Sequence, residues 1–117
     1  MYYAVVLGDE LLVERISQKS TFLHIDGTFS ILPGYISALK VRCAQILNIV
    51  AEYGPAVVSL FTVMMTGRKV GLYRGLYRHL KQKHPDLEPR EIMADWEPAL
   101  RKTAAEVWTD ARIIGCW

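Results

Sequence analysis

Hydrophobic and polar positions follow a period of two through most of the first half of the chain. This period is typical of β-strands, and it predicts strands at 2–7, 21–31, 43–53 and 56–65. Pro33-Gly34 and Gly54-Pro55 predict turns between the later strands. Because such short connections join antiparallel neighbours, the pattern predicts that the last three of these strands run antiparallel.

The period changes to 3.6 between residues 70 and 84, which predicts an amphipathic helix. Prolines end this helix, and a strand at 90–94 follows. Pro98 fits the first turn of a second helix that ends near residue 108, and a last strand is predicted at 111–115. The predicted core residues on the two helices are Tyr73, Tyr77, Leu76, Leu80, Leu100, Ala104 and Val107.

The order of predicted elements from residue 21 onward is β-β-β-α-β-α-β. Strands separated by helices run parallel in one sheet. The sequence therefore predicts an α/β fold, a mixed sheet of three antiparallel strands followed by parallel strands, with helices on its faces. Residues 9–18 predict a short helix with acidic residues in its first turn. We expect residues 1–20 to form a strand-and-helix extension to a core at 21–117.

Composition limits the classes of protein to which this chain could belong. With 117 residues, of which 51% are hydrophobic, the chain fits one domain with a core. The longest uncharged apolar run, 54–66, is shorter than the about 20 residues of a membrane helix. The first ten residues lack the features of a secretory signal, which predicts an intracellular protein. Cys43 and Cys116 lack metal-ligand spacing, so we expect two reduced thiols.

The net charge of +2 is too small to indicate nucleic-acid binding by itself. A basic segment lies between residues 68 and 83, where no acidic residue occurs. Such a stripe can follow a phosphate backbone, or it can be an ordinary solvated helix face. The candidate nucleic-acid-binding residues in this segment are Arg68, Lys69, Arg74, Arg78 and Lys81.

Two aspartates, Asp26 and Asp95, follow short apolar runs and are the candidate metal ligands. The carboxyl ends of parallel strands meet at one edge of a sheet, and carboxylates are ligands that Mg²⁺ prefers. Each aspartate also has a simpler interpretation. Asp26-Gly27 is a strong signal for a hairpin turn, and Asp95 could cap a helix. Glu97 could support the metal site, or it could simply be an acidic residue that the helix dipole favours near the start of a helix.

Several short blocks resemble the Mutator-like (MULE) transposases in their order and spacing. The resemblance runs from Phe22 to Trp117. The blocks that carry it are Asp26-Gly27-Thr28-Phe29 followed by Pro33, Gln45-Ile46-Leu47, residues 60–66 with Tyr73 after them, Asp95-Trp96-Glu97 with Ala99, and Gly115-Cys116.

The resemblance implies a ribonuclease H-like fold and a site with three acidic residues that binds two Mg²⁺ (or Mn²⁺) ions for DNA strand cleavage and transfer. Asp26 and Asp95 would be its first two catalytic metal ligands. It also implies a nuclear protein whose partner is the DNA of transposon ends.

The chain departs from the family pattern at its third acidic residue. No Asp or Glu follows Asp110, which precedes the last predicted strand and is poorly placed as a ligand. We therefore expect a partial, C-terminally incomplete core without transposition activity. An incomplete sheet would also expose apolar surface that favours self-association.

Two other functions stay open. The chain could be a domesticated, non-catalytic module that binds DNA or protein, or a stand-alone nuclease that recruits a different third acid.

Overall fold

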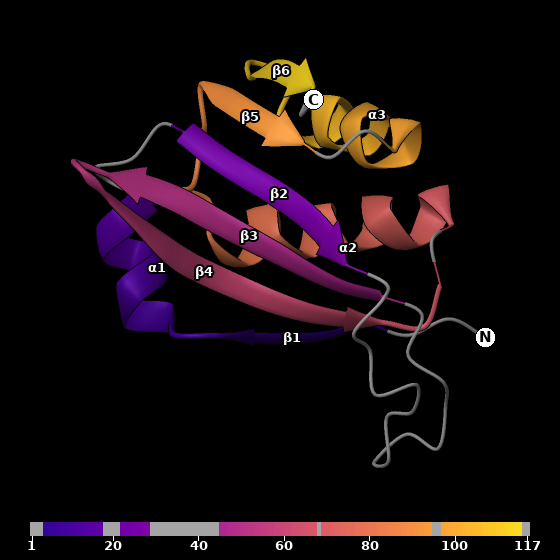
Figure 1. Cartoon of the computed structure of the whole chain (residues 1–117), viewed down its shortest axis with the longest axis horizontal. Helices are drawn as coiled ribbons and strands as arrows, with labels where there is room; N and C mark the ends of the chain where they lie inside the picture. The colour runs from indigo at the N-terminus through magenta and orange to yellow at the C-terminus, as the bar shows by residue number, and fades with distance from the viewer. Residues whose placement is uncertain (1–3, 18–21, 29–44, 68, 95–96, 116–117) are drawn as a thin grey trace.

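The computed structural model describes residues 4–17, 22–28, 45–67, 69–94 and 97–115. These residues form an α/β fold with one mixed sheet and three helices (Figure 1). The elements along the chain are β1 (Ala4–Gly8), α1 (Glu10–Ser17), β2 (Phe22–Thr28), β3 (Gln45–Tyr53), β4 (Ala56–Met65), α2 (Val70–Lys83), β5 (Glu91–Ala94), α3 (Pro98–Val107) and β6 (Arg112–Gly115).

The six strands lie in the order β1-β4-β3-β2-β5-β6. The pairs β1–β4, β4–β3 and β3–β2 are antiparallel, whereas β2–β5 and β5–β6 are parallel. The predicted mixed sheet, with antiparallel strands followed by parallel ones, is therefore confirmed. Gly54 has a positive φ of 60° at the tight turn between β3 and β4, a backbone conformation that glycine adopts without steric cost.

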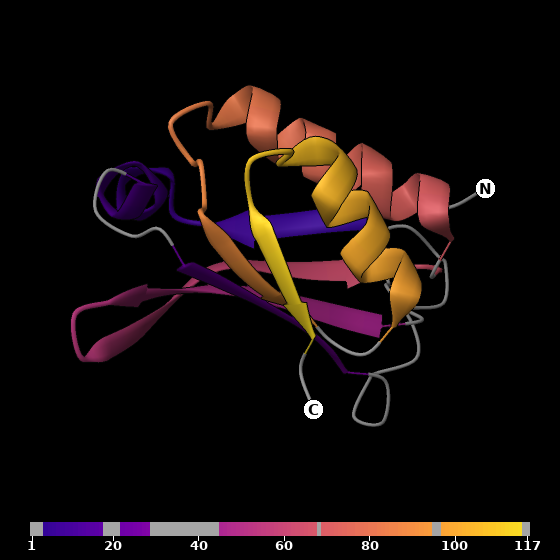
Figure 2. The ribbon, with the colours of Figure 1, turned by 90° about the horizontal axis from the view of Figure 1, so that it is seen from above.

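The three helices lie on one side of the sheet, as Figure 2 shows. Side chains on this side are fully buried at alternate positions of the central strands, for example Leu23 and Ile25 in β2 and Leu47 and Ile49 in β3. They form one core with residues of all three helices. The sequence predicted helices on the faces of the sheet, and the described helices cover one face.

The boundaries of the elements follow local sequence signals. Asp9 accepts hydrogen bonds at its Oδ1 from the backbone N–H groups of Leu11 and Leu12 at 3.0 and 3.3 Å, which starts α1. Pro98 occupies the first turn of α3, where its missing N–H costs nothing. The predicted buried residues of α2 and α3 are all buried. The predicted turn at Pro33-Gly34 and both cysteines lie outside the described residues.

The first part of the chain is continuous with the rest of the fold. β1 pairs with β4 from Ala4 to Gly8, and α1 contributes Val13 and Ile16 to the common core. Among the described helices, none is long and apolar enough to span a membrane.

Candidate metal-binding edge of the sheet

Asp26 lies inside a central strand. It pairs with Asn48 of β3, and Gly27, the residue after it, pairs with Leu47, so β2 continues through both residues. The hairpin turn that Asp26-Gly27 suggested is therefore wrong. Neighbouring strands on both sides supply a hydrogen-bonding partner for β2 over most of its length, and this pairing overrides the local turn signal. The Asp26 side chain is exposed, whereas Ile25 beside it is fully buried.

The parallel neighbour of β2 is β5, the strand that precedes Asp95. Their register pairs Ile25 with Ala94. Each of these residues comes directly before one of the two candidate aspartates in the sequence. Asp95 itself lies outside the described residues. The N-cap position of α3 is occupied by Glu97, and the alternative interpretation of Asp95 as a capping residue falls outside the described residues with Asp95 itself.

A short polar row crosses the sheet next to Asp26. Asn48 stands opposite Asp26 on β3, and Thr62 stands opposite Asn48 on β4. The Thr62 hydroxyl donates a hydrogen bond to Asn48 Oδ1 at 3.4 Å. Sequence reasoning did not select Asn48. The signal that could have found it is an amide at an alternate position of an otherwise apolar strand, but only the strand register places that amide beside Asp26.

A hydrogen-bond chain runs from the core to the start of α3. Gln45 Nε2 of β3 donates to the Tyr73 hydroxyl of α2 at 2.5 Å, and this hydroxyl donates to Glu97 Oε2 at 3.0 Å. Gln45 and Tyr73 are both fully buried. The Glu97 side chain makes no capping hydrogen bond to α3, so its carboxylate contacts Tyr73 rather than its own helix.

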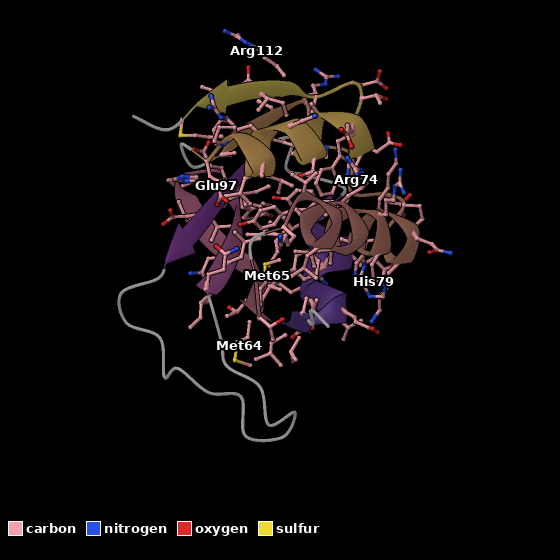
Figure 3. The ribbon with its side chains drawn as sticks, turned by 90° about the vertical axis from the view of Figure 1, so that its right-hand side faces the viewer. Met64, Met65, Arg74, His79, Glu97 and Arg112 are labelled. Atoms are coloured by element: carbon pink, nitrogen blue, oxygen red, sulfur yellow. The ribbon has the colours of Figure 1, made fainter. Side chains whose placement is uncertain are left out.

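Two residues of the basic segment contact α3. Arg74 Nε binds Glu106 Oε2 of α3 at 2.7 Å, and Figure 3 shows Arg74 on the α3 side of α2. Lys81 Nζ donates to the Val107 carbonyl at 2.9 Å. Lys69 and Arg78 are exposed, and Arg68 lies outside the described residues. Contacts with α3 therefore reduce the basic surface that the sequence suggested.

The Arg74–Glu106 ion pair shifts the pKa of each partner in the direction that favours its charged form. The hydrogen bond from Arg74 lowers the pKa of the Glu106 carboxyl below its ordinary value. The same hydrogen bond raises the pKa of the Arg74 guanidinium. The pair therefore links α2 to α3 most strongly where Glu106 is ionised.

The chain matches no family model, curated protein or solved structure with which it was compared. Among the described residues, no group of three or more His, Cys, Asp or Glu side chains could hold a metal ion. Among the described residues of the candidate site, the Asp26 carboxylate and the neighbouring Asn48 amide offer oxygen atoms. Both are types of ligand that fit Mg²⁺.

A separate groove lies on the opposite side of α2, between this helix, β1 and α1. Its volume is about 520 Å³, and apolar side chains such as Val6, Phe61 and Leu76 line it. His79 also lines the groove, and Figure 3 shows this residue on the side of α2 away from Arg74. His84 lines the groove as well, and its ring packs against Phe61 with centroids 5.6 Å apart.

Proposed function

We propose that this chain is a partial catalytic core of a Mutator-like DNA transposase with a ribonuclease H-like fold, in which Asp26 and Asp95 hold a divalent cation. The observation that carries the proposal is the parallel pairing of Ile25 with Ala94. It aligns the residues that precede the two aspartates on neighbouring strands, which is the relation that the resemblance requires of the first two acidic residues.

The arrangement of the sheet supports the same proposal. Three consecutive antiparallel strands, β2 to β4, are followed by two helix-separated strands that run parallel to β2. Asp26 lies in a continuous strand at the junction between these two parts of the sheet. The family block needs this placement, and a hairpin turn would have excluded it.

The chemistry of the donors suits a hard cation. When bound, Mg²⁺ would act as a Lewis acid toward a hydroxyl nucleophile and the leaving oxygen of a DNA phosphodiester. Asp26 and Asp95 would hold the ion, and the exposed Asp26 side chain leaves room for DNA to approach. Because the chain provides two of the family's three acidic residues, we expect metal binding without strand transfer. By the same resemblance, transposon-end DNA would be the partner and the nucleus the compartment.

Isothermal titration with Mn²⁺ or Mg²⁺ tests this function. Asp26→Asn and Asp95→Asn each remove one negative charge with little change in shape, and we expect each to abolish the binding heat of the wild-type chain. Asp86→Asn and Asp110→Asn are matched controls, because both aspartates are exposed and lie outside this edge. The controls should bind as the wild type does.

Equal binding by the wild type and by the Asp26→Asn, Asp95→Asn double variant would contradict the proposed site. A wild-type chain that binds neither ion at millimolar concentration would contradict it as well.

A further inference from the structure

We infer that Tyr73, together with Gln45, is a positioning residue that holds the start of α3 through Glu97. This inference rests on the proposed function for its consequence at the metal site. The observation that carries it is the hydrogen-bond chain from the buried Gln45 through the buried Tyr73 to Glu97. This chain joins β3, α2 and the first turn of α3, three elements that are distant in the sequence.

The two ends of the connection between β5 and α3 are fixed in different ways. At one end, Ala94 is fully buried and pairs with both Ile25 and Gly115. At the other end, Glu97 accepts the hydrogen bond from the Tyr73 hydroxyl. Only residues 95 and 96 lie between these two points. The described residues on either side of this two-residue segment are therefore both held by contacts with the rest of the fold.

Burial makes the hydrogen bonds of Gln45 and Tyr73 costly to break. Gln45 and Tyr73 are fully buried, and buried polar groups that lose their partners carry a large desolvation cost. The Gln45 amide nitrogen donates to the Tyr73 oxygen, which leaves the tyrosine proton directed to Glu97. The Glu97 carboxylate is therefore held by a donor that is itself held by the core.

The same helix provides a matched control. Tyr77 lies one turn after Tyr73 and is also fully buried, but its hydroxyl makes no hydrogen bond to any described residue. Tyr73→Phe and Tyr77→Phe thus delete the same atom from two buried rings of one helix. Only the first substitution removes a hydrogen bond to Glu97.

The first measurement is amide hydrogen exchange by mass spectrometry on the full chain without metal. We expect Tyr73→Phe to increase exchange selectively in the peptide that covers residues 94–100. Tyr77→Phe should leave that peptide unchanged. Glu97→Gln keeps an oxygen that accepts the Tyr73 proton, so this variant should exchange as the wild type does. An unchanged peptide in Tyr73→Phe, or an equal increase in both Phe variants, would overturn the inference.

The second measurement is Mn²⁺ titration of the same variants. Groups that orient metal ligands typically contribute 10-fold to 100-fold to affinity, so we expect Tyr73→Phe to raise the dissociation constant by about tenfold. Glu97→Gln should bind normally, because Glu97 acts through its hydrogen bond and not as a metal ligand.

The two measurements separate the inference from the proposed function. Faster exchange at residues 94–100 in a chain that binds no metal supports the positioning role and contradicts the metal site. Aspartate-dependent metal binding that Tyr73→Phe leaves unchanged supports the metal site and contradicts the positioning role. Weak binding by Glu97→Gln would also contradict it, because Glu97 would then contact the metal itself.

Discussion

At the scale of single residues, the requirement for glycine depends on how closely a neighbouring element approaches. Gly8 ends β1 and pairs with Phe61 of β4. A Cβ atom at Gly8 would lie 2.7 Å from the Leu60 carbonyl oxygen and 2.9 Å from Phe61 Cδ1. On α2, by contrast, a Cβ atom at Gly75 would meet nothing within 4 Å. The same residue type therefore has a steric role at one position and none at the other.

We predict opposite effects for alanine at these two glycines. Gly8→Ala should lower the free energy of unfolding by about 1–3 kcal/mol, because the new methyl group forces β1 away from β4. Gly75→Ala should raise it by roughly 0.5–1 kcal/mol, because alanine loses less backbone entropy in a helix. Urea denaturation followed by circular dichroism measures both values. A Gly8→Ala chain as stable as the wild type would contradict the close approach of the strands.

At the scale of elements, α2 connects the parts of the fold. Its apolar face contributes Tyr73, Leu76, Tyr77 and Leu80 to the core. Its polar side contacts α3 through the Arg74–Glu106 ion pair and through the hydrogen bond from Lys81 to the Val107 carbonyl. The basic side chains of this helix therefore hold α3 in place, which also supports the position of Glu97 at its start.

We predict that the contribution of Glu106 to stability depends on pH. Its folded-state pKa is lowered from the ordinary value of 4.5, chiefly by the hydrogen bond to Arg74. The stabilisation is therefore present above pH 4.5 and is lost as the pH falls through the folded-state pKa. Glu106→Gln should be less stable than the wild type at pH 7 and equally stable near about pH 2.

Urea denaturation across this pH range measures the difference between the two chains. Glu88→Gln, at an exposed carboxylate between α2 and β5, is the control and should differ little from the wild type. High salt at pH 7 should reduce the effect of Glu106→Gln, since screening weakens exposed ion pairs. A wild-type advantage that is constant from pH 7 to about pH 2 would contradict this role of the ion pair.

At the scale of the whole molecule, the core is one-sided. All three described helices pack on the same face of the sheet (Figure 2). On the other face, Leu7 is 53% exposed and side chains such as Ile46, Val50 and Met64 are only partly buried. The polar row of Asp26, Asn48 and Thr62 also lies on this open face. The candidate site therefore lies on the face that the described helices do not cover.

Two adjacent residues of β3 test this asymmetry. Ile49 is fully buried on the helix side, whereas Val50, the next residue, is only partly buried. We expect Ile49→Ala to lower the free energy of unfolding by about 2–5 kcal/mol through lost burial and a cavity. Val50→Ala should cost about 1 kcal/mol, mainly through weaker strand propensity and partial burial. Chemical denaturation would measure both, and equal losses would contradict a one-sided core.

The sequence predicted the elements well because their signals are local. The change of hydrophobic period at residue 70 marked α2, and the described α2 begins at Val70. Pro98 marked the first turn of α3. Tyr73 and Tyr77 could be assigned to the core because they share one helix face with Leu76 and Leu80. Each of these predictions depends only on residues within a few positions of one another.

The sequence by itself determined the strands, the helices and the mixed sheet, and it selected the two aspartates as candidates. These predictions depend on periodicity and residue type, which can be recognised from residues a few positions apart in the chain. Tertiary structure decided the rest. Pairing of β2 with β3 and β5 made Asp26-Gly27 part of a strand and set Asn48 beside it. Packing of α2 against α3 paired Arg74 with Glu106 and Tyr73 with Glu97. These contacts join residues that are far apart in the chain, so no local pattern could specify them.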